Sequence, residues 1–412
     1  MREMKDSGIE WIGEIPVDWE LNKIGSLYDE RRTKVSDKDY QPLSVTKQGI
    51  VPQLETAAKT DNGDNRKLIK KNDFVINSRS DRRGSCGISE YDGSCSLINT
   101  VLKPRKNMCN AYYSFVFRSE RFADEFYRWG TGIVDDLWST KWSNMKNIYI
   151  PFPTLEEQYR ISAYLDDKCT KIDSIIEKQE KVIEKLKDYK LSVITEAVTK
   201  GLNPDVKMKD SGVEFLGEVP ENWEVIKFGR CITIKSNLVP PENYYDYPQI
   251  APDSIEKNSA RLLDYKTVME SGVISWNHLF FKGQIIYSKI RPLLNKVIIA
   301  PFDGLCSADM YPIETKNNSK FIVYVILSNY FSAQVGLLTE NRVKMPKINQ
   351  NELSGIIVAI PKLEEQQQIA DYLDIKCSAI DKSIEQKQAI IEKLKEYKKS
   401  LIYEVVTGKR EV

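Results

Sequence analysis

The chain has 412 residues, of which 41% are hydrophobic and 29% are charged. This composition is typical of folded globular domains rather than of disordered chains, and the length favours two domains over one core. The net charge of +1 argues against strong overall attraction to nucleic acid, so a DNA site would need local clusters of basic residues.

Histidine and cysteine are too sparse for several common kinds of site. A single histidine, His278, argues against a histidine-based zinc site or a Ser-His-Asp triad, because both need a positioned imidazole with partners. Seven cysteines without Cys-x-x-Cys spacing predict neither a zinc ribbon nor a disulfide framework. No run approaches about 18 apolar residues, and four of residues 1–6 are charged, so we expect a cytoplasmic protein without a membrane span.

The opening segment of the chain returns in its second half. Residues 4–20 and 208–224 are identical at 11 of 17 positions. A second pair of segments, residues 155–201 and 363–409, is identical at 26 of 47 positions. The stretches between the matched segments, residues 21–154 and 225–362, are similar in length but share little identity. The chain is therefore a duplicated frame that holds two different inserts, which suggests two different targets.

The first insert predicts a mixed α/β domain, with a strand at 73–77 and a helix near 112–128. Around the strand and the loop after it, seven basic residues stand against two acidic ones between Arg66 and Arg83. Hydroxyl groups in this loop suit phosphate, and arginines can bind guanine through two hydrogen bonds. A second basic stretch follows at 139–144. The DNA-binding residues predicted for this insert are Lys70, Lys71, Ser78, Arg79, Ser80, Arg82, Arg83 and Lys141.

A long helix follows the first insert. It is predicted to begin after Pro153, with Glu156 and Glu157 in its first turn, and to end near Gly201. Apolar residues at heptad spacing predict a coiled-coil seam. The predicted seam residues are Leu165, Ile172, Ile175, Val182, Leu186, Tyr189 and Val193, while Ile176 and Ile183 widen the apolar stripe.

The second insert has the same plan with different residues. A strand at 284–288 precedes a basic loop, and a helix is predicted near 320–338. Another basic stretch covers residues 341–347. The predicted DNA-binding residues are Lys289, Arg291, Asn295, Lys296, Arg342, Lys344 and Lys347. The long helix after Pro361 repeats the seam with Leu373, Ile380, Ile390, Leu394, Tyr397 and Leu401, and Ile384 and Ile391 again widen the stripe.

The predicted fold is α+β, with two α/β domains separated by two long helices that pair antiparallel as a coiled coil in a pseudo-twofold repeat. The predicted boundaries are 1–154 and 202–362 for the two domains, and 155–201 and 363–412 for the helices. Gln179 and Lys387 occupy equivalent polar positions in the seam, where such residues can set the register.

These motifs resemble the specificity subunits of type I restriction-modification systems. The resemblance rests on Asp-Ser-Gly-x-Glu-Trp-x-Gly-x-x-Pro-x-x-Trp at 6–19, Pro-x-Pro-x-Leu-Glu-Glu-Gln at 151–158 and the long helix, which recur in the second half. The second copy departs from the pattern with Ile360-Pro361-Lys362 in place of Pro-x-Pro.

The resemblance implies that each insert is a target recognition domain that reads one half of a bipartite, asymmetric DNA site. It implies that the helices set the half-site spacing and bind two modification (methyltransferase) subunits, with restriction subunits as further partners of the complex. No cofactor is expected in this chain, because S-adenosylmethionine, ATP and Mg belong to the partner subunits. A metal site and a catalytic centre are likewise not expected.

Two alternatives compete with this interpretation. A self-contained methyltransferase or nuclease is disfavoured, because no Asn/Asp-Pro-Pro-Tyr/Phe motif or Walker A loop occurs. A coiled-coil adaptor whose inserts bind proteins instead of DNA agrees with the near-neutral charge. Salt dependence separates the DNA reader from the adaptor, because counterion release makes duplex binding weaken steeply as salt rises.

Overall fold

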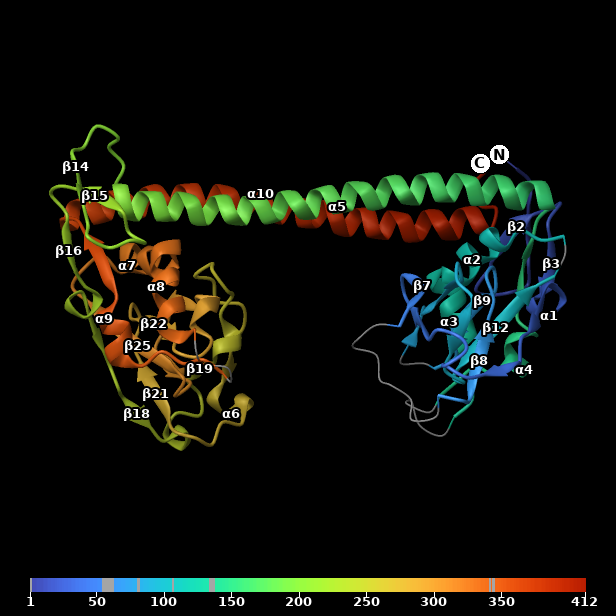
Figure 1. The fold of residues 1–412 in the computed structure, drawn as a ribbon, viewed down its shortest axis with the longest axis horizontal. Coiled ribbons are helices and arrows are strands. Elements are labelled where there is room, and N and C mark those ends of the chain that lie inside the picture. Colours follow the sequence, from blue (N-terminus) through green and yellow to red (C-terminus); the bar gives the residue numbers. More distant parts are fainter. Residues whose placement is uncertain are drawn as a thin grey trace. The chain divides into compact units, whose positions relative to one another are not determined.

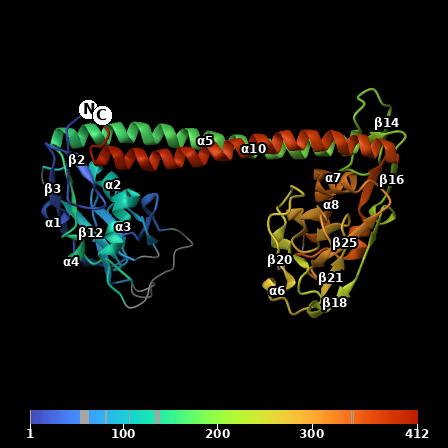
Figure 2. The ribbon, with the colours of Figure 1, turned by 180° about the vertical axis from the view of Figure 1, so that it is seen from behind.

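The computed structural model describes residues 2–53, 63–79, 82–105, 107–132, 138–340, 342 and 345–412. It divides into two compact units. Unit 1 combines residues 1–179 with residues 389–412, and unit 2 is the continuous segment 180–388. Both chain ends therefore lie in unit 1 (Figure 2). The units divide each long helix near its middle, so each unit holds part of both helices.

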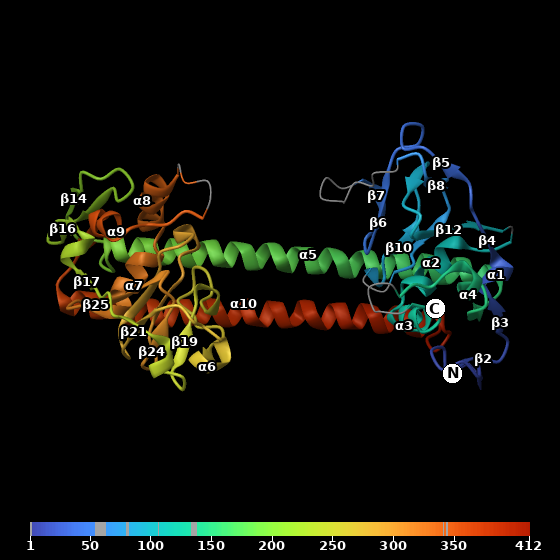
Figure 3. The ribbon, with the colours of Figure 1, turned by 90° about the horizontal axis from the view of Figure 1, so that it is seen from below.

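The two long helices are α5 (Leu155–Lys200) and α10 (Leu363–Val406). In each unit they run antiparallel and side by side (Figure 3). In unit 1, Lys398 of α10 donates to the carboxylate of Asp173 of α5 at 2.7 and 2.6 Å. In unit 2, Lys190 of α5 donates to Asp381 of α10 at 2.8 and 2.7 Å. These positions are equivalent in the sequence repeat, so each unit holds its helices in register with the same cross-helix ion pair.

The buried seam differs from the predicted one at five positions. Leu165, Ile172, Leu373, Ile380 and Leu401 are buried as predicted, and Leu186, Val193 and Leu394 are half-buried. However, the remaining predicted seam residues are exposed: Ile175, Val182, Tyr189, Ile390 and Tyr397.

Elsewhere in the seam the buried residue lies one position later along the heptad. Ile183 is only 8% exposed, for example, whereas Val182 before it is 38% exposed. Cys169, Cys377, Ile384 and Ile391 follow the same pattern. Steps of three and of four residues both return to the same face of an α-helix, so a heptad pattern alone does not decide between them. The packing of the helices selects the four-residue step.

The core of unit 1 lies between an antiparallel sheet and two helices (Figure 1). The sheet order is β10 (Cys86–Ile88), β9 (Phe74–Asn77), β12 (Asn99–Pro104), β4 (Tyr28–Glu30). Helices α2 (Asn110–Arg118) and α3 (Glu120–Arg128) complete a core of buried aromatic rings, to which Leu401 and Val405 of α10 also belong. The other elements of unit 1 are β1 (Met4–Asp6), β2 (Glu14–Pro16), β3 (Glu20–Lys23), α1 (Ile24–Leu27), β5 (Lys34–Val35), β6 (Leu43–Thr46), β7 (Gly49–Pro52), β8 (Arg66–Ile69), β11 (Gly93–Cys95), α4 (Trp142–Met145) and β13 (Tyr149–Phe152).

Unit 2 repeats this plan. Its four-stranded sheet has the order β17 (Ile232–Ile234), β25 (Met310–Thr315), β22 (Ile285–Ser288), β23 (Val297–Ile299). Helix α7 (Ser319–Leu327) lies next to the long helices, and α8 (Asn329–Thr339) follows it (Figure 1).

A second sheet, of five strands, has the order β18 (Leu238–Val239), β21 (Asn277–Phe280), β24 (Gly304–Cys306), β19 (Pro248–Ile250), β20 (Lys266–Thr267). The other elements of unit 2 are β14 (Met208–Asp210), β15 (Glu218–Pro220), β16 (Glu224–Lys227), η3 (Phe228–Arg230), η4 (Pro241–Asn243), η5 (Pro252–Ser254), α6 (Val268–Ser271), η6 (Pro292–Leu294), α9 (Gln350–Gly355) and β26 (Ile357–Ile360).

A serine breaks the single helix that was predicted in each insert. Ser119 separates α2 from α3, and Ser328 separates α7 from α8. Both serines adopt extended backbone angles, and the Ser119 side chain accepts a hydrogen bond from the backbone N–H of Phe122. Serine favours helix N-caps, and Ser119 makes the capping hydrogen bond. The Ser328 hydroxyl donates instead to the carbonyl of Val325, in the turn before it. Among the described residues, no single helix is long and apolar enough to cross a membrane. Helices α7 and α8 reach that length and apolar character only when they are taken together, and the chain bends between them.

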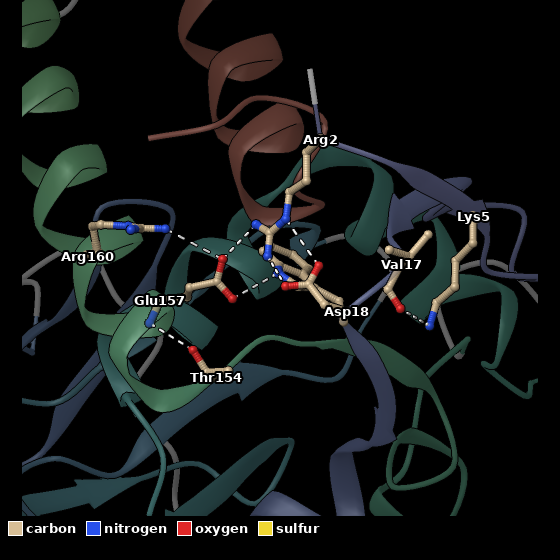
Figure 4. A network of polar contacts seen from close by, with 8 residues as sticks. Arg2, Lys5, Val17, Asp18, Thr154, Glu157 and Arg160 are labelled. Carbon is tan, nitrogen blue, oxygen red and sulfur yellow. Dashed lines mark hydrogen bonds and ion pairs between the residues drawn. The ribbon is translucent and has the colours of Figure 1, made fainter.

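The repeated motifs hold each domain against its long helix. In unit 1, the indole N–H of Trp19 donates to Glu157 Oε2 at 3.0 Å, and in unit 2 the indole of Trp223 donates to Glu365 Oε1 at 3.1 Å. In unit 1, Arg2 and Arg160 also pair with Glu157 (Figure 4). The two Trp–Glu contacts explain why the Pro-x-x-Trp and Leu-Glu-Glu-Gln motifs recur together.

The glutamine of the same motif joins the helix of the insert to the long helix. Gln158 accepts from the backbone N–H of Cys109, just before α2, at 2.9 Å. Gln366 accepts from the N–H of Asn318, just before α7, also at 2.9 Å. Each glutamine therefore satisfies a helix-terminal N–H that has no partner within its own helix.

Candidate nucleic-acid interface

In unit 1 the structure brings two predicted basic segments together. The loop that follows β9 begins with Ser78 and Arg79, and the second segment contains Ser139, Thr140 and Lys141. The backbone N–H of Thr140 donates to the carbonyl of Ser78 at 2.9 Å, and Arg79 forms a β-bridge with Ser139. Residues about 60 positions apart in sequence therefore form one continuous surface beside the end of the central strand.

Unit 2 has the same backbone connection with other side chains. The N–H of Ile348 donates to the carbonyl of Lys289 at 2.9 Å, directly after β22, and Ile290 forms a β-bridge with Lys347. This bond matches the one between Thr140 and Ser78. We call the two equivalent surfaces the strand-end faces: residues 78, 79, 82 and 83 with 139–141 in unit 1, and residues 289–296 with 342 and 345–347 in unit 2.

The cations of the unit 1 face differ in their partners. Arg83 forms an ion pair with Asp124 and lies over the ring of Tyr127. Arg82 also interacts within the protein. Lys141 is exposed, and within the described part of the chain its side chain has no hydrogen-bond or ion-pair partner. Ser80 lies outside the described residues. Ser78 donates its hydroxyl proton to the carbonyl of Ile98.

Lys70 and Lys71 do not lie on the strand-end face. They precede β9, whereas the face follows its end, so the length of the strand separates them from Arg79. The Lys70 ammonium donates to Asp92 at 2.8 Å, and this hydrogen bond raises the pKa of Lys70. The backbone N–H of Lys71 donates to the same carboxylate.

Most cations of the unit 2 face are held by neighbouring groups. Lys347 and Lys289 both approach Asp309 Oδ1, at 3.0 and 3.9 Å. Lys296 donates to the carbonyl of Pro252 at 2.7 Å and lies 3.5 Å from the carboxylate of Asp253. Lys344 lies outside the described residues.

Arg342 and Asn295 are also engaged. Arg342 binds the carboxylate of Glu352 through both of its terminal nitrogens, and this hydrogen bonding raises the pKa of the guanidinium. Asn295 is buried, and its amide donates to Ser332 Oγ at 2.6 Å.

The histidine and the cysteines are positioned as parts of the core. His278 is buried on β21, and burial lowers the pKa of its imidazole. All seven cysteines are buried. Burial raises the pKa of the Cys86 and Cys95 thiols to about 12, so these thiols stay protonated near neutral pH and are poor nucleophiles. Within the described ranges, no group of three or more His, Cys, Asp or Glu side chains is placed to hold a metal ion.

The sequence reasoning missed two features of the frame. One is the cross-helix ion pairs, whose lysine and aspartate are conserved between the two halves of the chain and recur at the same spacing. The other is an exposed apolar stripe that occurs once on each long helix: Val182 and Tyr189 on α5, and the equivalent Ile390 and Tyr397 on α10. The lysine and the aspartate are among the identities of the repeat, but identity alone does not show that they pair across the helices.

The comparisons with known proteins agree with one another. The family model for the type I restriction modification DNA specificity domain matches residues 16–185 and 220–396. The chain is 30% identical over 378 residues to the type I restriction enzyme EcoDI specificity subunit of Escherichia coli, covering 87% of this chain and 81% of that protein. It is 26% identical over 432 residues to the type I restriction enzyme MjaVIII specificity subunit of Methanocaldococcus jannaschii, covering 96% and 93%.

Two solved structures share the fold. A chain from a study of complex assembly and conformational transition in a type I restriction-modification system gives a TM-score of 0.72 at 14% identity, covering 96% of this chain and 99% of that one. The crystal structure of the HsdS subunit from Thermoanaerobacter tengcongensis gives a TM-score of 0.52 at 14% identity, covering 96% and 98%.

Proposed function

Because the chain belongs to the DNA specificity subunits of type I restriction-modification systems, which are non-catalytic components of these enzymes, we propose that each unit reads one half of a bipartite, asymmetric DNA site. One observation carries the proposal. The two strand-end faces share one backbone connection, at 2.9 Å in each unit, but carry different side chains. A common support with different readers is what two unlike half-sites require.

In unit 1 we assign DNA contact to the strand-end face. Lys141 is an exposed cation without a partner in the described chain, which suits a phosphate. Arg79 follows the buried central strand, and its backbone is fixed by the bridge to Ser139 and by a hydrogen bond from the Tyr127 hydroxyl at 3.0 Å. Lys70 and Lys71 lie at the other end of β9, so the proposal leaves them out.

The exposed stripe on the long helices supports a role in assembly. Val182 and Tyr189 on α5 and their equivalents Ile390 and Tyr397 on α10 follow heptad spacing, yet the helix pair leaves them exposed. Apolar side chains at this spacing are suited to packing against a further helix. Since the stripe occurs once on each helix, we assign it to two modification subunits.

Catalysis and half-site spacing complete the proposal. S-adenosylmethionine, ATP and Mg would act in the partner subunits. The helices would fix the gap between the half-sites, because the ion pairs Lys190–Asp381 and Lys398–Asp173 oppose sliding of one helix along the other.

The test is to coexpress the chain with its modification subunit and map adenine methylation across the host genome. The expected result is a split motif with a constant gap. Binding of the purified complex to a duplex that carries the motif should weaken steeply as salt rises, because phosphate contacts release counterions. Absence of both methylation and duplex binding would instead indicate an adaptor whose domains bind proteins.

A further inference from the structure

We propose that Arg291 reads a guanine in the half-site bound by unit 2. This inference rests on the proposed function and concerns one residue of the unit 2 strand-end face. The described cations of that face differ in whether neighbouring groups of the protein already bind them.

The described lysines of the face have structural partners. The carboxylate of Asp309 lies between Lys347 and Lys289, and the Lys289 ammonium also lies 5.4 Å from the centre of the Tyr311 ring. Lys296 is only 15% exposed and ties the loop to the carbonyl of Pro252. Moving either Lys289 or Lys296 to DNA would break contacts that hold the loop in place.

The other polar candidates are committed as well. The guanidinium of Arg342 is already bound within the protein, because it donates to the carbonyl of Lys347 and to the carboxylate of Glu352. Asn295 points into the protein, where its amide meets Ser332. Neither side chain is free to approach a base.

Arg291 differs from all of these. It is exposed, and its guanidinium has no hydrogen-bond or ion-pair partner among the described residues. Its backbone is nevertheless fixed: the N–H donates to the carbonyl of Pro346 at 2.8 Å, and Pro292 begins the short η6 turn immediately afterwards.

The backbone of this loop is strained where it presents the arginine. Arg291 has a φ of 44° and Asn295 a φ of 47°, in the left-handed region that residues other than glycine seldom adopt. Strained residues of this kind concentrate at binding sites, where the surrounding structure holds them. A free guanidinium on a loop with a fixed backbone suits bidentate recognition of guanine O6 and N7, because its planar fork of donors matches those two acceptors.

The experiment uses the coexpressed complex and the methylation map. Arg291→Ala should relax one guanine position in one half-site, lowering the preference for guanine there by about ten- to a hundredfold, and leave the other half-site unchanged. Arg291→Lys keeps the charge but loses the fork of parallel donors, so it should relax the same position while retaining more overall methylation. Arg230→Ala is the matched control. It removes another exposed guanidinium of unit 2 that has no hydrogen-bond or ion-pair partner among the described residues and lies outside the face, and it should leave the motif unchanged.

Each outcome decides the inference. If Arg291→Ala lowers methylation at all sites with the motif intact, and Arg291→Lys restores it, the arginine contacts phosphate and base reading is refuted. Unchanged motifs and methylation in both variants also refute it. If Arg291→Ala fails to fold, Arg291→Lys alone decides by whether the guanine position relaxes. A wild-type complex without any split motif would overturn the proposed function itself, which keeps the two failures distinct.

Discussion

Replacing Asp381 with alanine should destabilise unit 2 more than the equivalent change at Asp173 destabilises unit 1. The Lys190 side chain is 8% exposed and its partner Asp381 is 47% exposed, whereas Lys398 and Asp173 are 28% and 58% exposed. Breaking a fully buried ion pair costs about 3–5 kcal/mol, because it leaves a charge in the interior. Exposed pairs contribute about 0–1 kcal/mol.

With one partner buried and the other half exposed, we expect Asp381→Ala to lower the free energy of unfolding by about 2 kcal/mol. Asp173→Ala should cost less than about 1 kcal/mol, because solvent reaches both Asp173 and its partner Lys398. Lys190→Met should be close to neutral, since it replaces the buried ammonium with an apolar chain and leaves Asp381 hydrated.

Urea unfolding of the full-length variants measures the total loss of stability. Hydrogen–deuterium exchange then assigns it: peptides from 180–200 and 363–388 report on unit 2, and those from 155–179 and 389–406 on unit 1. Equal costs at the two aspartates would refute the reasoning from burial. A larger cost for Lys190→Met than for Asp381→Ala would show that the ion pair adds net stability.

Three further predictions follow from the site and the frame. Burial lowers the pKa of His278 in the folded state, so the stability that its neutral form contributes is fully present above the unfolded-state pKa of about 6.5 and is lost as pH falls through the folded-state pKa. His278→Gln should therefore flatten the dependence of thermal stability on pH below about 6.5, and an unchanged dependence would contradict this. Trp223→Phe removes the hydrogen bond to Glu365 and should lower the free energy of unfolding in urea by about 1–2 kcal/mol. The double variant Trp223→Phe with Glu365→Ala should lose less than the sum of the two single variants, because both changes break the same contact. Tyr189→Ser with Tyr397→Ser should weaken binding of the modification subunit at least tenfold in titration calorimetry yet change unfolding by less than about 0.5 kcal/mol, since both rings are exposed; full affinity in the double variant would refute the assignment of the stripe.

The duplicated frame was predictable because its two copies share many identical residues. The motif glutamates and tryptophans stand at the same places in both halves, and the structure gives both pairs the same contact. The side of the helix that forms the seam was not predictable, since Ile175 and Ile176 both continue a heptad from Leu165 and only packing decides between them.

The strand-end faces were predictable as basic segments but not as binding groups. Lys289 and Lys347 were both candidates, yet they share Asp309, which lies some 20 to 40 residues away in sequence. A list of charges does not show such pairing, because partners far apart in sequence meet only through the fold. For the same reason, Arg291 was one candidate among several until the partners of the others were known.

Unit 1 is built from both ends of the chain, whereas unit 2 is a single continuous segment. During synthesis, all of unit 2 therefore leaves the ribosome before Leu401 and Val405, which share a core with Ile161 and Leu165. We expect the second domain to complete its core while the first still exposes the apolar surface that α10 will cover. The order of folding would then be the reverse of the order of the domains in the sequence.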